Sequence, residues 1–392
     1  MNSRQFSFSF PALLLVLLLA NSLQAQFDPL SLKRGDTLQI DGRLTTIQRL
    51  ETMPYVQSEY TKRFKFDTFE NPKLKDLRDH HHLDQVIAPG KDEFEQQVLL
   101  MDWAHQQFKK FGHPSTNVHG AIQILDSIDK GHSFFCAQYA QVLVSAAASL
   151  GWVDRELALR CHQGNVKNGS SEHSTTEIWS NQHRKWIMLD PTSNMYLEKN
   201  GVPLNAWEIR DEWFYHGGSN LLFVVGKERK RYKKSDLPVF LARFEGFGNL
   251  TIDPDEPNKY GFIGYIPNTD LMDAGEDYGQ MFITKDKVCA GQKWHERKNP
   301  AQPATDPYFP IDQSALTLHP GKGALKASLQ TFTPNFKEFQ IRVDAGDGAD
   351  SWKNSSSSFD WKVHHGVNKL EARAINKFGV AGPVSSAEVL VR

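Results

Sequence analysis

The sequence predicts an α+β fold for the middle of the chain, followed by a small all-β sandwich at the C-terminal end. Two observations carry this prediction. Between about residues 92 and 190, apolar residues first recur at helical spacing and then fall in short strand-like segments. Beyond residue 312, apolar and polar residues alternate, which is typical of strands with one buried face.

Three helices are expected in the α+β region. Asp92 and Glu95 have the spacing of a capping box, and the helix that follows carries an apolar stripe. A shorter helix is expected at about residues 121–128. The third is predicted to begin with Ser133 as its N-cap and to stop at Gly151. The apolar stripe of the first helix consists of Phe94, Val98, Leu99, Trp103, Phe108 and Phe111.

Strands are expected in two further groups. The first group follows the third helix, at residues 157–161, 175–179 and 186–189. The second follows a proline-rich stretch at residues 299–311, which predicts an extended linker. It comprises alternating segments near residues 339–343, 359–363, 370–374 and 387–391. This pattern predicts a β-sandwich over residues 312–392. Its segment from Phe359 to Pro383 resembles immunoglobulin-like or fibronectin type III modules of exported bacterial proteins.

The N-terminal residues predict export. Arg4 precedes an apolar run of nine residues, Ala12 to Ala20, which is too short to span a bilayer but fits a signal peptide. We expect cleavage after Ala25, a secreted or periplasmic location, and no membrane span in the mature chain. Residues 26–90 are predicted to be an N-terminal extension of unknown role.

Charge and cysteine content exclude some functions. The chain has 45 basic and 46 acidic residues, and this balance argues against nucleic acid as a partner. The three cysteines are Cys136, Cys161 and Cys289. No two lie within four residues of each other, so neither a metal site nor a cofactor is predicted. In an oxidising compartment, we expect Cys161 and Cys289 to pair and Cys136 to stay free.

Cys136 is the candidate nucleophile. Its predicted place in the first turn of a helix favours a thiolate, and free backbone N–H groups there could stabilise an oxyanion. Residues 181–184 form a turn-like stretch between two strand-like segments. If the turn is centred between residues 181 and 182, His173 lies directly opposite Asp190. This register supplies a base and a carboxylate to orient it. His132, His162 and His183 are rival bases and rank lower.

The order and spacing of these residues resemble the transglutaminase-like superfamily over about residues 95–195. The matching pattern is Gly131-x4-Cys136-x2-Tyr139-Ala140, Gly151-x3-Arg155, His173-x3-Glu177 and Trp186-x3-Asp190-Pro191-Thr192. The resemblance implies a papain-like catalytic domain, assigned to residues 91–298, with a catalytic helix on an antiparallel sheet. It also implies a triad of Cys136 as nucleophile, His173 as base and acid, and Asp190 as the orienting carboxylate.

Further roles follow from the same resemblance. Some relatives use an upstream Trp or Gln as an oxyanion donor, and Trp103 is the candidate here, although it also belongs to the apolar stripe. Glu177 and Tyr139 are candidates for support of the triad, and Arg155 is expected to make a structural ion pair. The chain departs from the family at Ser174-Thr175-Thr176, where an aromatic residue is usual.

The leading functional hypothesis is a cysteine peptidase or amidase that forms a thioester on Cys136. Its substrate would be a peptide, a protein or a cell-wall peptide. A protein-crosslinking transglutaminase is the first alternative, because an amine can replace water in resolving the thioester. A non-catalytic scaffold is the second, in which the C-terminal domain contacts a glycan or a surface.

Overall fold

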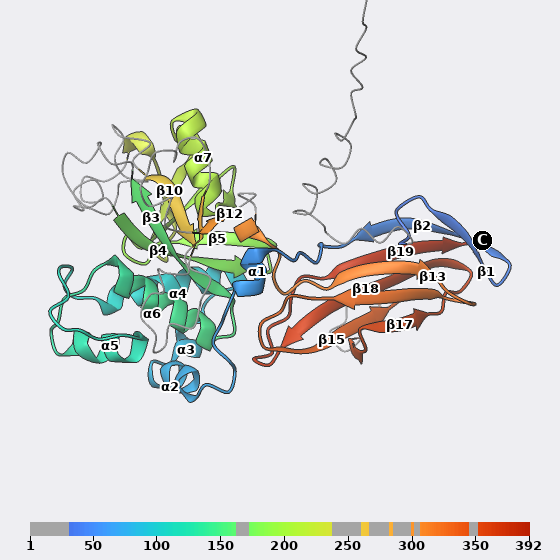
Figure 1. The fold of residues 1–392 in the computed structure, drawn as a ribbon, viewed down its shortest axis with the longest axis horizontal. Helices are drawn as coiled ribbons and strands as arrows, with labels where there is room; N and C mark the ends of the chain where they lie inside the picture. The colour runs from blue at the N-terminus through green and yellow to red at the C-terminus, as the bar shows by residue number, and fades with distance from the viewer. Residues whose placement is uncertain are drawn as a thin grey trace, which may run out of the picture.

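The structure is a computed structural model that describes residues 31–161, 172–236, 260–265, 282–284, 299–301, 306–344 and 352–392. It has two bodies, an α+β body and an elongated all-β sandwich (Figure 1). The α+β class predicted from the sequence is confirmed, and most sheet pairings are antiparallel. The predicted signal peptide and His162 lie outside the described residues. Within them, no helix is long and apolar enough to cross a membrane.

The α+β body is built on a six-stranded sheet with the order β12-β11-β10-β3-β4-β5. A smaller sheet has the order β7-β6-β8-β9. All neighbours pair antiparallel except β11 and β12. The first sheet comprises β3 (Asp154–Cys161), β4 (Glu172–Ser180), β5 (Lys185–Leu189), β10 (Tyr260–Tyr265), β11 (Phe282–Thr284) and β12 (Asn299–Ala301). The second comprises β6 (Met195–Lys199), β7 (Val202–Pro203), β8 (Leu222–Val225) and β9 (Lys230–Lys233).

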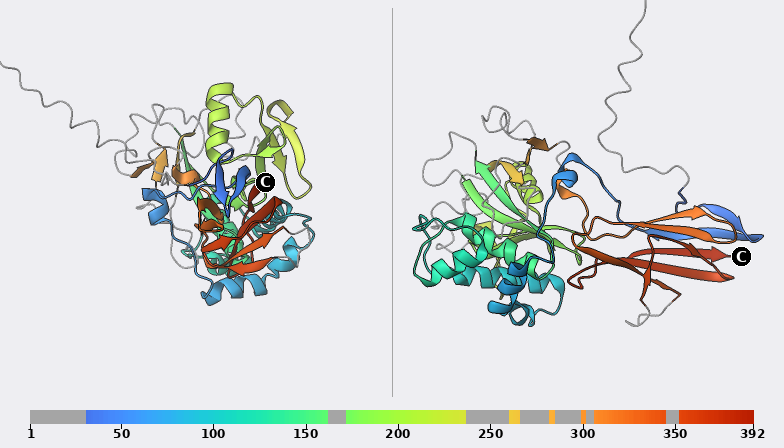
Figure 2. Two further views of the ribbon diagram at one scale, coloured as in Figure 1. Left: turned by 90° about the vertical axis from the view of Figure 1, so that its right-hand side faces the viewer. Right: turned by 60° about the horizontal axis from the view of Figure 1, so that its bottom comes forward.

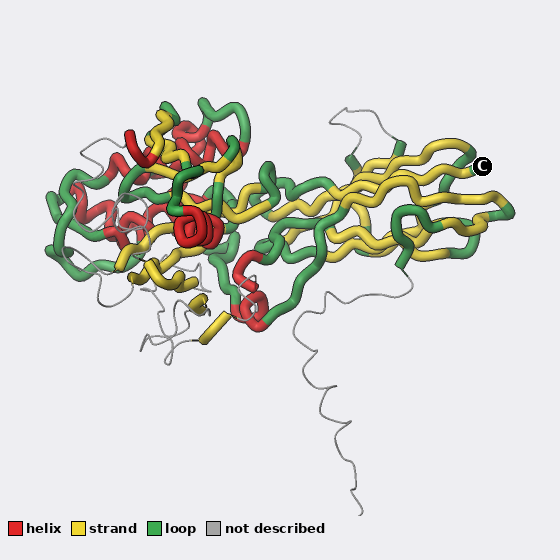
Figure 3. The backbone as a smooth tube through the Cα atoms, turned by 90° about the horizontal axis from the view of Figure 1, so that it is seen from above, coloured by secondary structure: helices red, strands yellow, loops and turns green. Residues whose placement is uncertain are grey.

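The described helices all belong to the α+β body, as the red segments of Figure 3 show. The helix that carries Cys136 packs against β3 and β4 through a buried face that includes Val142, Leu143 and Ala146. Asp92 caps its neighbour α4, because its carboxylate accepts from the Glu95 N–H at 2.9 Å. The helices are α1 (Glu59–Arg63), α2 (Pro72–His80), α3 (Leu83–Ile87), α4 (Glu93–Gln107), α5 (Ala121–Asp129), α6 (Cys136–Ser149) and α7 (Ala206–His216).

The all-β sandwich contains strands from both ends of the described chain. One sheet has the order β1-β2-β19-β18-β15-β16 and the other β13-β14-β17. Trp361, Leu370 and Val389 are buried between them. The strands are β1 (Thr37–Ile40), β2 (Arg43–Glu51), β13 (Ala315–Pro320), β14 (Leu325–Gln330), β15 (Phe336–Val343), β16 (Lys353–Ser355), β17 (Ser358–Trp361), β18 (Gly366–Asn376) and β19 (Ser385–Val391).

This strand order differs from the division expected from the sequence. Strand β2 pairs antiparallel with β19, and Val389 lies opposite Ile47. Ile47 is fully buried. The sandwich therefore includes residues 37–51, which we had assigned to the separate extension over residues 26–90. The blue strands beside the red ones in Figure 2 show how the N-terminal hairpin joins the C-terminal sheet.

The proline-rich stretch is also more than a linker where the structure describes it. Phe309 is buried against Tyr60, Phe64 and Trp186 in the core of the α+β body. Its carbonyl accepts from the Trp186 Nε1–H at 3.0 Å. The extended linker expected over residues 299–311 therefore contributes an aromatic side chain to the core, since burial of such a ring is strongly favourable.

The sandwich contacts the C-terminal end of the helix that begins at Cys136. The Asn376 Nδ2–H donates to the carbonyl of Gly151 at 2.8 Å, just beyond the C-terminal end of α6. Gly151 has φ of +86°, and a Cβ there would lie 2.5 Å from Cβ of Phe378. Only glycine fits both the left-handed conformation and this close approach. The helix that begins at Cys136 is thus fixed at its far end by the second body.

Candidate active site

Cys136 is the first residue of α6. Phe135 is the N-cap, and its N–H donates to the Gln138 side chain at 3.1 Å. The expectation that Ser133 caps this helix is wrong, because the Ser133 hydroxyl donates to the His113 carbonyl at 2.7 Å. Cys136 is partly exposed, and the backbone N–H of Ser174 donates to its Sγ at 3.4 Å. The helix dipole and this donor both stabilise negative charge on the sulfur.

His173 and Asp190 meet beneath this sulfur in the sheet. The His173 Nε2 lies 3.1 Å from Oδ2 of Asp190, and both side chains are almost fully buried. The second oxygen of Asp190 accepts from the Thr192 N–H at 3.0 Å, which fixes the carboxylate. The Cys136 side chain also acts on His173, because it adds to the effect of Asp190 in raising the pKa of the imidazole. The structure thus brings the three predicted residues together in the order thiol, imidazole, carboxylate.

The predicted hairpin register was wrong, although the contact it predicted is present. In the structure Trp179 pairs with Trp186 and Thr176 with Leu189. The turn is therefore centred between residues 182 and 183, one residue later than predicted. Strand β5 ends at Leu189, and Asp190 follows as an isolated bridge with Met195. This shift changes the partner of each residue by two positions, which keeps every side chain on its face of the sheet. Asp190 therefore still reaches His173, as a diagonal neighbour.

The electrostatics favour a protonated imidazole. Burial lowers the pKa of His173, but the charge and hydrogen bond of Asp190, followed by those of Cys136, outweigh it and raise the pKa to about 10. An imidazolium held between a carboxylate and a thiolate is the ion pair required for attack by sulfur.

The residues expected to support the triad have different surroundings. Tyr139 lies one turn after Cys136 and stacks on Phe108, with ring centroids 3.6 Å apart. Burial, and then the charge of Cys136, raise the pKa of Tyr139 to about 12. Trp103 packs against His81, with ring centroids 5.6 Å apart, beside the core formed by the helices. Its role as an oxyanion donor stays a prediction.

Glu177 belongs to a structural network and not to the contacts of His173. Its carboxylate pairs with Arg155 at 2.5 Å, and both side chains are fully buried. It also accepts from the Ala206 N–H at 2.8 Å and the Tyr308 hydroxyl at 3.2 Å. The expectation of a structural ion pair for Arg155 is confirmed.

The rival histidines that the structure describes lie elsewhere. His132 contacts the Ser115 hydroxyl at 2.8 Å. His183 packs its ring against Phe94 at 5.1 Å on the hairpin turn, and burial lowers its pKa. Neither has the carboxylate partner that His173 has in Asp190.

Two features of the site were missed in the sequence. The backbone N–H of Ser174 contacts the sulfur, and only the fold could reveal it, because any residue at that position would supply this group. His105 donates from Nδ1 to the Pro191 carbonyl at 2.9 Å and so fixes the segment after Asp190. A histidine at the end of α4 gave no spacing signal for this contact.

The predicted disulfide falls outside what the structure describes, since the Cys161 side chain and Cys289 are not included. Cys136 is a free cysteine. No cluster of three or more metal-ligating side chains occurs among the described residues.

Comparisons with known proteins add little to this geometry. No protein-family model matches the chain, and a search of curated proteins finds no match. Among solved structures, the chain is similar to a candidate cysteine protease from Cytophaga hutchinsonii, with 16% identity and a TM-score of 0.26. The match covers 38% of this chain and 49% of that protein, so the chain spans about half the length of that protein.

Proposed function

We propose that the chain is a cysteine-dependent hydrolase that cleaves amide bonds through a Cys136 thioester, in a transglutaminase-like, papain-like domain. The observation that carries the proposal is the buried His173 imidazole, which lies 3.1 Å from Asp190 and precedes Ser174, whose N–H donates to the Cys136 sulfur at 3.4 Å. A buried histidine between a carboxylate and a thiol at a helix N-terminus has the geometry of a nucleophile, base and orienting group.

The acylation step follows from these positions. The Cys136 thiolate attacks the carbonyl carbon of the amide and forms a C–S bond, while the carbonyl oxygen becomes an oxyanion. The backbone N–H groups of Cys136 and Ala137, which precede the first hydrogen bond of α6, are the candidate donors to that oxyanion. The C–N bond then breaks, and the His173 imidazolium gives its proton to the leaving amine.

Deacylation returns the enzyme to its starting state. The now neutral His173 takes a proton from water as the water oxygen attacks the thioester carbon. The C–S bond breaks, the carboxylic acid leaves, and the thiolate and imidazolium are restored. Asp190 keeps the imidazole oriented through Nε2, so that the other ring nitrogen carries the transferred proton in both steps.

Activity on a library of fluorogenic peptide amides tests this proposal. Cys136→Ala is expected to abolish turnover, and His173→Ala to lower kcat/KM by about 10²–10⁴-fold through loss of the general base. His183→Ala is the matched control, because that histidine lies on the same hairpin without a carboxylate partner, and it should keep wild-type turnover. Turnover that survives in Cys136→Ala would overturn the proposal.

The same assay separates hydrolysis from cross-linking. With glycine ethyl ester present, a hydrolase yields the free acid, whereas a transglutaminase yields the acid joined to the amine. Product masses distinguish the two. We favour hydrolysis, because Cys136 is partly exposed and exclusion of water needs a closed, dry cleft. A non-catalytic scaffold predicts neither product. Export to a secreted or periplasmic location is part of the proposal.

A further inference from the structure

We propose that an aromatic shelf beside Cys136, formed by Phe111, His113 and Phe135, binds an aromatic side chain of the substrate next to the bond that is cleaved. This inference rests on the proposed function and adds a substrate preference to it. Phe135 directly precedes the nucleophile in the chain. Its ring centroid lies 5.6 Å from that of Phe111 and 4.7 Å from that of His113.

The shelf is held firmly against the start of α6. The Gly112 N–H donates to the Phe134 carbonyl at 3.1 Å, and Phe111 and Phe134 form a parallel bridge. On the other side of Gly112, the His113 carbonyl accepts from the Ser133 hydroxyl at 2.7 Å. The backbone of the segment from Phe111 to His113 is therefore fixed to the residues that precede Cys136.

Rings beneath the shelf leave its outer surface rigid and apolar. Tyr139 is buried and stacks on Phe108, while its centroid lies 6.2 Å from that of Phe111. Phe111 is 37% exposed, His113 is exposed, and Phe135 is partly buried. A pre-ordered exposed ring loses little conformational entropy when a ligand covers it.

The position of the thiol identifies the occupant. An acyl group bound to the partly exposed Sγ of Cys136 would lie near the N-terminal end of α6, where Phe135 is the N-cap and adjoins Cys136 in the chain. The three shelf side chains offer ring faces and edges but no carboxylate, and aromatic pairs gain about 0.5–1.5 kcal/mol beyond area burial. The shelf therefore suits an aromatic side chain better than a small or acidic one.

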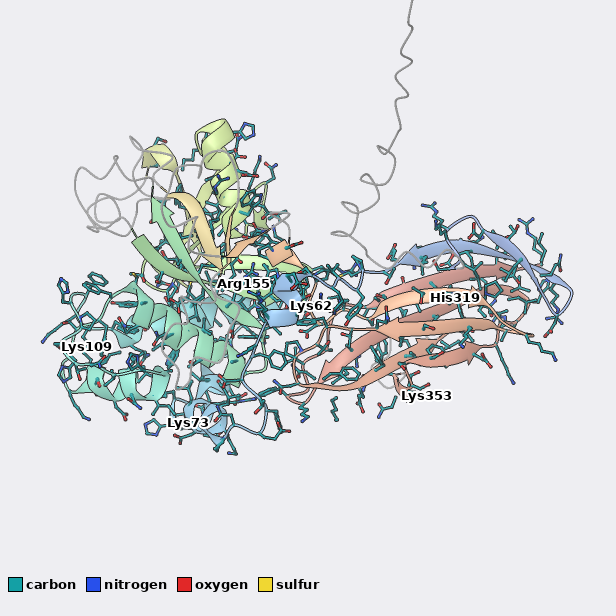
Figure 4. All side chains as sticks on the ribbon, viewed as in Figure 1. Lys62, Lys73, Lys109, Arg155, His319 and Lys353 are labelled. Atoms are coloured by element: carbon teal, nitrogen blue, oxygen red, sulfur yellow. The ribbon has the colours of Figure 1, made fainter. Side chains whose placement is uncertain are left out.

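The segment that carries Phe111 and His113 follows closely on a residue that lies far from the second body of the molecule. Lys109, two residues before Phe111, lies at the end of the α+β body farthest from the sandwich (Figure 4). The described sandwich therefore leaves this end open to a substrate.

Peptidyl chloromethyl ketones that differ only in the residue next to the reactive group test the shelf. In the wild type, we expect the phenylalanine probe to alkylate Cys136 about tenfold faster than the alanine probe, measured by mass spectrometry of the intact chain. Phe111→Ala should lower the ratio to about one, and Phe111→Tyr should retain it, because the ring is kept. Phe336→Ala is the control, since Phe336 in β15 is equally exposed, at 37%. It should leave the ratio unchanged.

Iodoacetamide, which is too small to use the shelf, separates this inference from the proposed function. Its rate should fall in His173→Ala and stay at the wild-type value in Phe111→Ala. Equal rates for the two peptidyl probes in the wild type, or a ratio unchanged in a folded Phe111→Ala chain, would overturn the shelf and leave the triad intact. An iodoacetamide rate that is insensitive to His173→Ala would instead overturn the triad.

Discussion

Replacing Arg155 by alanine is expected to lower the free energy of unfolding by about 3–5 kcal/mol, because it leaves the buried Glu177 carboxylate without its cation. The Arg155 guanidinium donates to Glu177 from Nε at 2.9 Å and from Nη2 at 2.5 Å. It also donates to the Pro307 carbonyl and to the Tyr60 hydroxyl and lies 4.1 Å from the Trp186 ring centroid. One side chain thus joins α1, β3, β4 and the segment before the sandwich.

Urea denaturation measures this loss, and the exposed pair of Lys62 and Glu59 supplies the control. The two residues that are compared, Arg155 and Lys62, are labelled in Figure 4. Lys62→Ala removes a pair whose side chains are 58% and 70% exposed, and it should cost little stability, because water and salt screen exposed charges. The double variant Arg155→Met with Glu177→Met should recover much of the loss, because no unpaired charge remains. A loss in Arg155→Ala as small as that in Lys62→Ala would contradict the network.

The second large effect concerns the pH dependence of stability, and it is measured in a Cys136→Ala chain so that the thiol does not titrate in the same range. Burial lowers the pKa of His173, and Asp190 opposes burial more strongly than Cys136 does, so we expect the pKa to stay above the ordinary value of about 6.5 in this chain. The folded state then keeps a proton that the unfolded state loses. Stability present below pH 6.5 is therefore lost as the pH rises through the raised pKa of the folded state, by up to about 1.4 kcal/mol per pH unit.

Changing Asp190 to Asn in the same chain should reverse the sign. Burial is then the main influence, and it lowers the pKa of His173 below that of the unfolded chain. Stability should consequently fall as the pH drops through about 6.5 and be insensitive to His173 above it. The free energies of unfolding of the two chains, measured between pH 5 and pH 10, should diverge with pH. Parallel curves would mean that Asp190 does not charge His173.

The sequence predicted the local parts of the site well, because local patterns encode them. The Asp92 cap, the helix of Cys136 and the strands of His173 and Asp190 each have a nearby signal. The register of the β4–β5 hairpin was predicted with the turn centre one residue too early, because the turn residues 181–184 do not specify where the turn is centred. The face of each side chain was still correct, because that depends only on the period of two.

Contacts between distant segments could not be predicted from one sequence. Strand β2 pairs with β19 across more than three hundred residues, and no pattern in either strand specifies the other. The hairpin of β1 and β2 does have a local signal in the sequence. Asp41 and Gly42, with φ of 48° and 75°, form the two-residue Asp-Gly turn that favours a β-hairpin. Likewise, Phe309 among the prolines was an aromatic residue that a free linker does not need.

The rate of alkylation of Cys136 by iodoacetamide as a function of pH tests the central claim most directly. In the wild type, the His173 imidazolium should support a reactive thiolate at mildly acidic pH. In His173→Ala, the rise in rate should move toward that of an ordinary thiol, near pH 8.5. Asp190→Asn should move it less, because the imidazole remains but is poorly oriented. Three superimposable profiles near pH 8.5 would contradict the triad and the enzyme function proposed from it.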